Sequence, residues 1–298
     1  IDAVVVATVT EKPNLVMTWK GETIVDLERA FLDTNGVRVV VDANVVDKDV
    51  ALPEVRTTSA ATLEADTVKV LSDLNHASQK GLQTIFDSSV GRSTVNHPIG
   101  GRYQITPTES SVQKLPVQNG ITTTASVMAQ GFNPYIAEWS PYHGAAYAVI
   151  EATARLVATG ADWSRARFSY QEYFERMDKQ ADRFGQPVAA LLGSIEAQIQ
   201  LGLPSIGGKD SMSGTFEELT VPPTLVAFGV TTVDSRQVLS PEFKTAGENI
   251  YYISGQAISE DIDFDYIKAN FAQFEAIQAK HKVTAASAVK YGGVLESL

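Results

Sequence analysis

The feature that most constrains the fold is an alanine-rich helical pattern in the middle of the chain. Ser140-Pro141 is a helix start, because a serine hydroxyl caps the first turn and proline fits the first helical position. Gly160 ends the pattern. The apolar positions at helical spacing are Ala145, Ala148, Val149, Ala152 and Leu156. So many small side chains predict close packing of this helix against a sheet or another helix.

Strand and helix signals alternate on both sides of this pattern. β-branched residues predict strands over 117–126 and 224–233. We expect a polar helix over 170–184 and a second, amphipathic helix that starts at Pro187 and ends at Gly202. The expected elements nearer the ends are strands over 4–10 and 15–19 and helices over 24–32 and 264–282. This order of elements predicts an α/β fold.

Charge and composition exclude several classes of protein. Lys and Arg number 24 against 35 Asp and Glu, and the net charge of −11 argues against a nucleic-acid-binding protein. Without cysteine there is no disulfide scaffold, thiolate metal site or cysteine nucleophile. Apolar runs such as residues 37–41 are far shorter than the ~20 residues of a membrane-spanning helix. With no signal peptide, we expect an internal piece of a larger cytoplasmic protein.

A glycine-rich segment over residues 202–214 is the strongest signal for a binding site. Gly207 and Gly208 free backbone N–H groups to approach an anion, to which Lys209 adds a positive charge. Asp210 offers a carboxylate for Mg²⁺. The segment is not a Walker A loop, since Asp210 follows Lys209 where that motif needs Ser or Thr. It is therefore either a phosphate or metal loop, or a flexible connection.

Two further groups of polar residues leave alternatives open. Glu151 and Arg155 fit an i,i+4 ion pair, or a Glu151 that faces a polar cleft and binds Mg²⁺. No histidine lies three or four positions from another, so no helical histidine pair for a metal exists. His97, in a loop with Arg92 and Arg102, fits either a phosphate contact or a solvated residue.

Two strings of residues resemble the phosphoribosylformylglycinamidine synthase family in its large single-chain form. They are Gly207-Gly208-Lys209-Asp210-Ser211-Met212-Ser213 and Val221-Pro222-Pro223-Thr224-Leu225-Val226. Val90-Gly91-Arg92, Leu115-Pro116-Val117 and residues 152–160 match as well. The resemblance runs through most of the chain, and it is specific because the Lys-Asp-Ser-Met-Ser string and the Pro-Pro pair are unusual.

The family catalyses an ATP-dependent carbon–nitrogen ligation in purine synthesis, in which glutamine supplies ammonia and formylglycinamide ribonucleotide becomes the amidine. The resemblance implies PurM-like (aminoimidazole ribonucleotide synthetase-like) domains, α/β with a mixed β-sheet packed with helices. Residues 1–61 would end a first C-terminal-type domain, 62–235 would form a second N-terminal-type domain, and 236–298 would start a second C-terminal-type domain. The glutaminase and first N-terminal-type domains, the expected partners, have no counterpart here. We therefore expect no catalytic residues in this chain and no activity from it alone.

The resemblance also implies an auxiliary ATP or ADP site in this half. Its phosphate-binding residues fall at Gly207, Gly208, Lys209, Asp210 and Ser211. Its Mg²⁺ ligands fall at Asn119, Glu151, Arg155 and Asp210, where the family has Asp at the first position and Asn at the third. An Arg side chain has no acceptor atom for a metal. We therefore expect a decayed site in which Arg155 replaces the cation and pairs with Glu151 or Asp210.

Two other interpretations stay open. One is a structural dimerisation module with no ligand of its own, which a salt bridge between Lys209 and Asp210 would favour over an open pocket. The other is a kinase-like relative such as thiamine-monophosphate kinase, which the Pro-Pro pair and the long loop over 88–116 disfavour. The N-terminal-type domains of the family pair across their sheets, so we expect an exposed apolar sheet face and a homodimer.

Overall fold

The chain divides into two units, Ile1–Asp42 and Ala43–Leu298. The computed structural model describes residues 2–33, 40–45, 51–53, 57–85, 93–211 and 214–298. The domain boundaries expected after residues 61 and 235 stay predictions. The first unit is a β-hairpin and one helical turn, and the second holds a central sheet covered by helices on one face.

In the first unit, β1 (Asn14–Trp19) pairs antiparallel with β2 (Glu22–Glu28), and α1 (Arg29–Leu32) follows. The turn residues Lys20 and Gly21 both have positive φ, 49° and 88°, as a tight two-residue hairpin turn requires. The strand predicted over 15–19 is confirmed. The strand predicted over 4–10 is wrong, because these residues have no regular structure. The helix predicted over 24–32 is wrong for residues 24–28, since these residues belong to β2 and pair across the hairpin.

A six-stranded sheet forms the centre of the second unit, in the order β3-β6-β7-β12-β8-β9. Its strands are β3 (Thr94–Asn96), β6 (Ser111–Lys114), β7 (Thr124–Gly131), β8 (Arg167–Tyr173), β9 (Ser205–Lys209) and β12 (Thr224–Asp234). Neighbours are antiparallel except β8 and β9, which are parallel. Alternate residues of β7, β8 and β12 are buried, so one face of the sheet meets the core.

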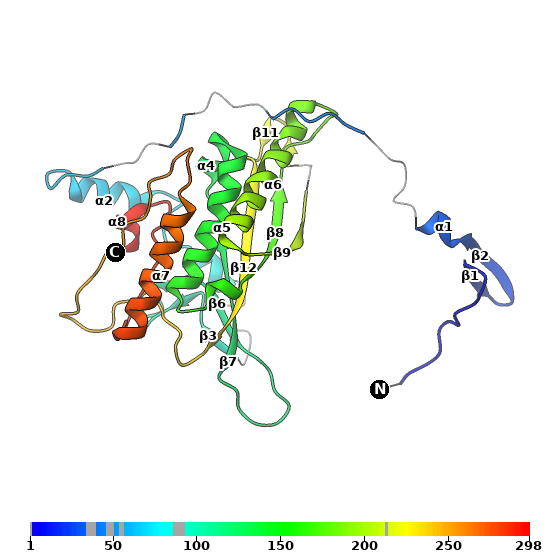
Figure 1. Ribbon diagram of the computed structural model, residues 1–298, viewed down its shortest axis with the longest axis horizontal. Coiled ribbons are helices and arrows are strands. Elements are labelled where there is room, and N and C mark those ends of the chain that lie inside the picture. The colour runs from blue at the N-terminus through cyan, green and yellow to red at the C-terminus, as the bar shows by residue number, and fades with distance from the viewer. Residues whose placement is uncertain (1, 34–39, 46–50, 54–56, 86–92, 212–213) are drawn as a thin grey trace. The chain divides into compact units, whose positions relative to one another are not determined.

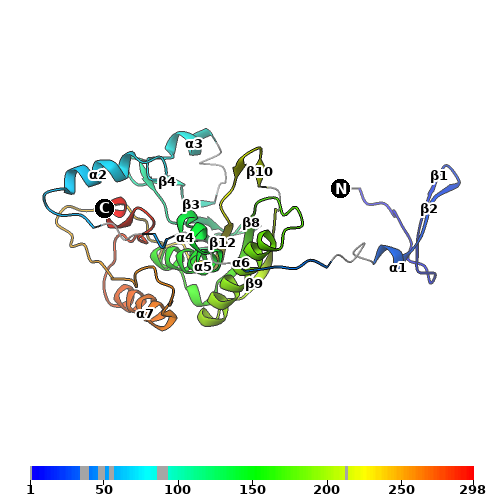
Figure 2. The ribbon, with the colours of Figure 1, turned by 90° about the horizontal axis from the view of Figure 1, so that it is seen from above.

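Two long helices cover that face (Figure 1). α5 (Pro141–Ala158) packs against α6 (Ala181–Leu201) and lies on β7 and β12. α7 (Phe264–Lys280) contacts both helices on their outer side (Figure 2). Half of the buried residues of α5 are alanines, and their close contact with α6, β7 and β12 confirms the packing that the sequence predicts. In the part of the chain that is described, no helix is long and apolar enough to cross a membrane.

Short elements surround this core. The helical ones are α2 (Leu63–Ser72), α3 (Lys80–Ile85), α4 (Pro134–Trp139), η1 (Trp163–Arg165) and α8 (Gly293–Ser297). Two small hairpins pair β4 (Ile99–Gly100) with β5 (Thr106–Pro107) and β10 (Thr215–Phe216) with β11 (Leu219–Thr220). Residues 115–123 form the exposed connection between β6 and β7, so the strand predicted over 117–126 begins only at Thr124.

Two predictions near α6 are corrected. The polar helix predicted over 170–184 is wrong as far as residue 180, because these residues form the end of β8, which lies between two other strands, and a loop. Residues 181–184 are helical but belong to α6. α6 begins at Ala181 rather than at Pro187, which lies inside the helix. Its end at Gly202 is confirmed, with a left-handed φ of 71°.

Candidate functional site

The sheet brings Glu151 and the glycine-rich segment to the same end of its strands. The register aligns one residue from each of four strands, namely Gly131, Ala227, Tyr170 and Gly208. The backbone N–H of Phe132, the next residue after β7, donates to Glu151 Oε2 at 3.3 Å. Lys209 follows Gly208 on β9. Since neighbouring strands lie about 4.8 Å apart, three spacings separate β7 from β9 by about 14 Å. Glu151 and Lys209 therefore lie at the same end of the sheet without contacting each other.

The glycine-rich segment is half strand. Ser205–Lys209 form the exposed edge strand β9, and Gln171 Nε2 donates to the backbone oxygen of Lys209 at 3.1 Å. Lys209 Nζ donates to Ser211 Oγ at 2.7 Å. Among the described residues neither Lys209 nor Asp210 forms an ion pair, so the salt bridge that would favour a scaffold is not formed. Met212 and Ser213 lie outside the described residues.

Glu151 and Arg155 form the i,i+4 ion pair that their spacing predicts, with 2.6 Å between Glu151 Oε1 and an Arg155 guanidinium nitrogen. Arg155 Nε also lies 3.9 Å from Oε2 of Glu109, a carboxylate only 3% exposed. Glu109 Oε1 accepts from Ser287 Oγ at 2.8 Å and pairs with Lys290 Nζ at 3.1 Å. We call Glu109, Glu151, Arg155 and Lys290 the charge cluster.

Asn119 lies far from this cluster. It is exposed in the connection before β7, whereas Glu151 contacts the residue after the end of β7. A strand of eight residues extends about 26 Å. The structure therefore brings Arg155 to Glu151 but brings neither Asn119 nor Asp210 into contact with them.

Burial is the largest influence on the pKa of two carboxylates at this end of the sheet, those of Glu151 and Glu172. Burial raises the pKa of Glu151, and the nearby Arg155 opposes that effect. Burial and the charge of Asp210 raise the pKa of Glu172, on β8, to about 7. The Tyr170 hydroxyl is buried without a hydrogen-bond partner among the described residues, and burial raises its pKa. Glu172 is not among the predicted site residues, because the sequence predicts a helix over 170–184. Read as a strand, Phe168, Tyr170 and Glu172 fall on one face.

A second polar site contains two residues that the sequence singles out. His97 and Arg102 line a cavity of about 310 Å³ together with Gly101, Thr108 and Glu242. Arg92 lies outside the described residues. The choice between a phosphate contact and a solvated position for His97 stays open.

The residues around Glu151 do not fit a magnesium ion. Mg²⁺ demands a near-octahedral set of oxygen ligands. Arg155 offers no oxygen on its side chain, and both Glu151 oxygens already face donors. Within the described ranges, no group of three or more His, Cys, Asp or Glu side chains could hold a metal.

Comparisons with known proteins identify relatives of the chain. No family model matches. The chain is 26% identical over 287 residues to phosphoribosylformylglycinamidine synthase subunit PurL of Methanosarcina barkeri, an alignment covering 94% of this chain and 36% of that protein. Thermotoga maritima PurL complexed with FGAR matches with a TM-score of 0.57 and 15% identity, over 91% of this chain and 38% of that one. The same protein complexed with ATP matches with a TM-score of 0.51 and 15% identity, over 77% and 33%.

These comparisons confirm the resemblance and the fold class. The chain is similar to PurL subunits over most of its length. It spans about a third of the length of the curated relatives it matches. The solved structures share its α/β fold, with a mixed sheet packed with helices of the PurM-like kind.

Proposed function

We propose that this chain is part of a phosphoribosylformylglycinamidine synthase, a ligase that uses ATP and glutamine to make formylglycinamidine ribonucleotide. The similarity to PurL over 94% of the chain carries this proposal. The chain supplies the second, pseudo-symmetric half of that enzyme, and the remaining domains supply the catalytic and glutaminase parts. The first unit favours the existence of a further domain in the whole enzyme. Its two-stranded hairpin, with Leu15, Trp19 and Ile24 exposed, is too small to form a core by itself.

The auxiliary nucleotide site of this half is degenerate in our proposal. The Lys209 ammonium lies beside the Ser211 hydroxyl on an exposed edge, and such a pair suits a phosphate of ATP or ADP. Glu151 faces Arg155 instead of a metal. The same observation favours the second candidate, a structural module of the enzyme without a ligand of its own.

Calorimetric titration of ADP into the chain, with and without Mg²⁺, tests this part of the proposal. We expect weak binding that Mg²⁺ does not strengthen, and about tenfold weaker binding for Lys209→Ala, because a charge-assisted contact is lost. Lys179→Ala, at an exposed turn away from β9, serves as the control. Binding that requires Mg²⁺ would contradict the degenerate site, and no binding to the folded chain would favour the structural module.

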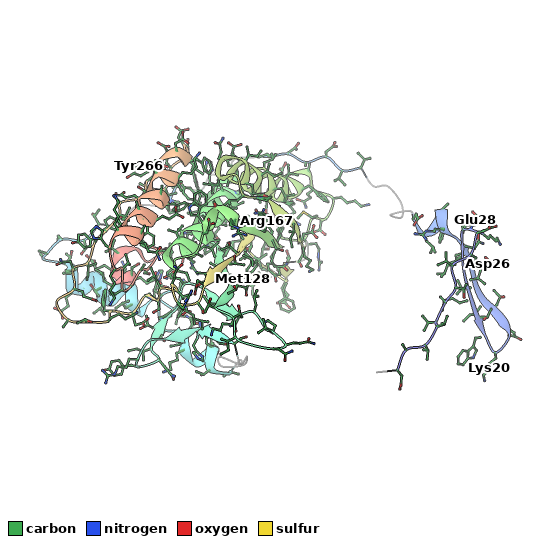
Figure 3. The ribbon with its side chains drawn as sticks, turned by 60° about the horizontal axis from the view of Figure 1, so that its bottom comes forward. Lys20, Asp26, Glu28, Met128, Arg167 and Tyr266 are labelled. Atoms are coloured by element: carbon green, nitrogen blue, oxygen red, sulfur yellow. The ribbon has the colours of Figure 1, made fainter. Side chains whose placement is uncertain are left out.

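The open face of the sheet supplies the surface for a partner domain. Its apolar residues on the three central strands are Met128, Tyr173, Val226, Phe228 and Val230. Val230 lies opposite Met128 on β7 and Arg167 on β8. Figure 3 labels Met128 and Arg167. Such a face on a central sheet marks an interaction site. We propose that it packs on the sheet of the first N-terminal-type domain in the whole enzyme, and on a second copy in the isolated chain.

The oligomeric state tests that surface. We expect a dimer by light scattering at micromolar concentration, and a monomer for Val230→Lys, since the dimer would bury the new charge. Ile199→Lys, at an exposed apolar position of α6, is the matched control and should stay dimeric. A wild-type monomer, or a dimer that Ile199→Lys alone disrupts, would show that the sheet face is not the interface.

A further inference from the structure

The charge cluster joins three distant parts of the second unit. Glu151 and Arg155 come from α5, Glu109 from the connection before β6, and Lys290 from the segment that follows α7. The side chains are 3% exposed for Glu109, 19% for Glu151, 17% for Arg155 and 21% for Lys290. Two carboxylates and two cations sum to zero, so the cluster is neutral without any bound ion.

We propose that Arg155 and Lys290 together take the place of a divalent cation between Glu109 and Glu151, and that residues 287–290 thereby act as a built-in ligand closing this site. The identity of the divalent cation that is replaced rests on the proposed function. The contacts of the charge cluster, and its role in holding residues 287–290, do not depend on that function.

The contacts leave no position for a metal between the carboxylates. Glu109 Oε1 already has two donors, Ser287 Oγ and Lys290 Nζ. Its Oε2 faces Arg155 Nε across 3.9 Å, and both of these atoms are buried without a hydrogen bond to any residue that the structure describes. A cation placed between them would lie against the guanidinium, so like charges would repel it.

Lys290 also acts on the second carboxylate. Burial raises the pKa of Glu151, and Lys290 is one of the nearby charges that oppose this effect, while its ion pair is with Glu109. Arg155 is the cation near both carboxylates, at 2.6 Å from Glu151 and 3.9 Å from Glu109, and Lys290 adds a second cation at Glu109. Removing Lys290 leaves two carboxylates with only Arg155 between them.

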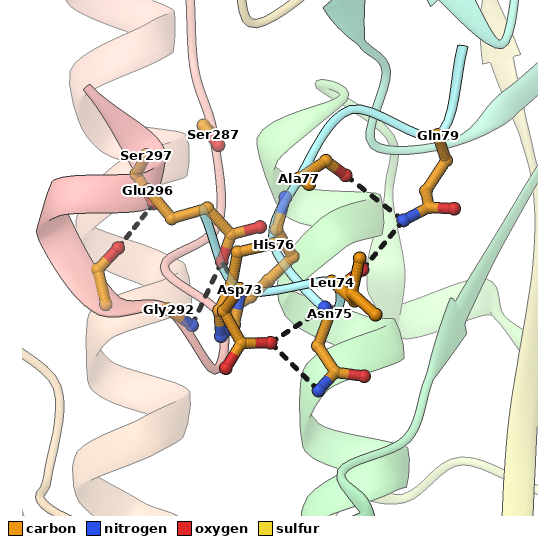
Figure 4. A network of polar contacts seen from close by, with 12 residues as sticks. Asp73, Leu74, Asn75, His76, Ala77, Gln79, Ser287, Gly292, Glu296 and Ser297 are labelled. Carbon is orange, nitrogen blue, oxygen red and sulfur yellow. Dashed lines mark hydrogen bonds and ion pairs between the residues drawn. The ribbon is translucent and has the colours of Figure 1, made fainter. Parts of the chain in front are cut away.

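A second anchor holds the same segment in place. The Tyr291 ring stacks between His76 and Tyr135, with centroid distances of 4.8 Å and 4.4 Å. Glu296 Oε2 lies 3.3 Å from His76 Nδ1 and accepts the backbone N–H of Gly292 at 2.9 Å (Figure 4). Lys290 thus directly precedes a fixed ring, which positions its side chain over the cluster.

Thermal melting and limited proteolysis of the chain test the proposal, with Mg²⁺ alone as the probe. We expect the wild-type melting temperature to be unchanged by millimolar Mg²⁺. Lys290→Met should melt lower with or without Mg²⁺, because Arg155 still repels a metal ion. It should also be cleaved after Lys282 roughly tenfold faster, because the buried Glu109 charge loses its partner and the segment opens more often. Lys290→Arg keeps the charge and should behave as the wild type.

The double variant Glu109→Gln with Lys290→Met separates charge from packing. It removes one charge of each sign, so it should recover much of the melting temperature lost in Lys290→Met. If Lys290→Met does not fold, Mn²⁺ binding to the wild type by electron paramagnetic resonance still decides, with no binding at Glu151 expected. Mn²⁺ binding that Glu151→Gln abolishes, or a Lys290→Met variant as stable and protected as the wild type, would overturn the proposal. None of these readouts depends on ligase activity.

Discussion

Replacing Gly131 by alanine is expected to lower the free energy of unfolding by about 3 kcal/mol, at the upper end for an overpacked core. A Cβ at Gly131 would overlap the carbonyl oxygen of Ala148 and lie 2.7 Å from the backbone nitrogen of Ala152. Both are backbone atoms of α5, so no side-chain rotation relieves the overlap. β7 and α5 must therefore separate, and urea denaturation measures the cost.

The same substitution reports on the site. The close approach at Gly131 holds the Phe132 N–H within reach of Glu151, so moving the strand weakens that hydrogen bond. Gly255→Ala is the matched control, since a Cβ there meets no atom of the described residues within 4 Å, and we expect a change below about 0.5 kcal/mol. A Gly131→Ala protein as stable as the control would mean that β7 and α5 do not touch as described.

The long helices show what local signals can predict. The cap at α5 is as expected, with Ser140 Oγ accepting the N–H of His143 at 3.4 Å, and Gly160 follows the helix with a φ of 85°. Both signals lie within a few residues of the helix ends. β8 was missed because its polar residues resemble a solvated helix, and only pairing with β12 and β9 makes them a strand. That pairing involves residues distant in sequence.

The residues of the charge cluster likewise divide into those whose pairing local spacing predicts and those that only the fold brings together. The pairing of Arg155 with Glu151 follows from their spacing on one helix. Glu109 and Lys290 carry no such signal, because 181 positions separate them and only the folded chain brings them together. The family pattern pointed to a departure at Arg155, yet it could not show which charges would surround that residue.

Glu172→Gln is expected to stabilise the chain by about 2 kcal/mol at pH 8 and to have little effect at pH 4. Burial and the charge of Asp210 raise the pKa of Glu172 from 4.5 to about 7 in the folded chain. Between these pH values the folded state binds more protons than the unfolded state, so stability falls as pH rises from about 4.5 to about 7. Each tenfold change in proton affinity is worth about 1.4 kcal/mol, and partial solvent contact reduces the sum.

Urea denaturation at several pH values, in buffer with a chelator, measures the effect. The neutral amide removes the charge that the folded chain disfavours, so the stability of the variant should vary less between pH 4.5 and 7 than that of the wild type. Glu218→Gln, at an exposed carboxylate, is the control and should change stability by less than about 0.5 kcal/mol at either pH. If Glu172→Gln instead destabilised the chain at pH 8, the carboxylate would be stabilised by a donor. Glu172 would then be a carboxylate paired with a hydrogen-bond donor and not an isolated one.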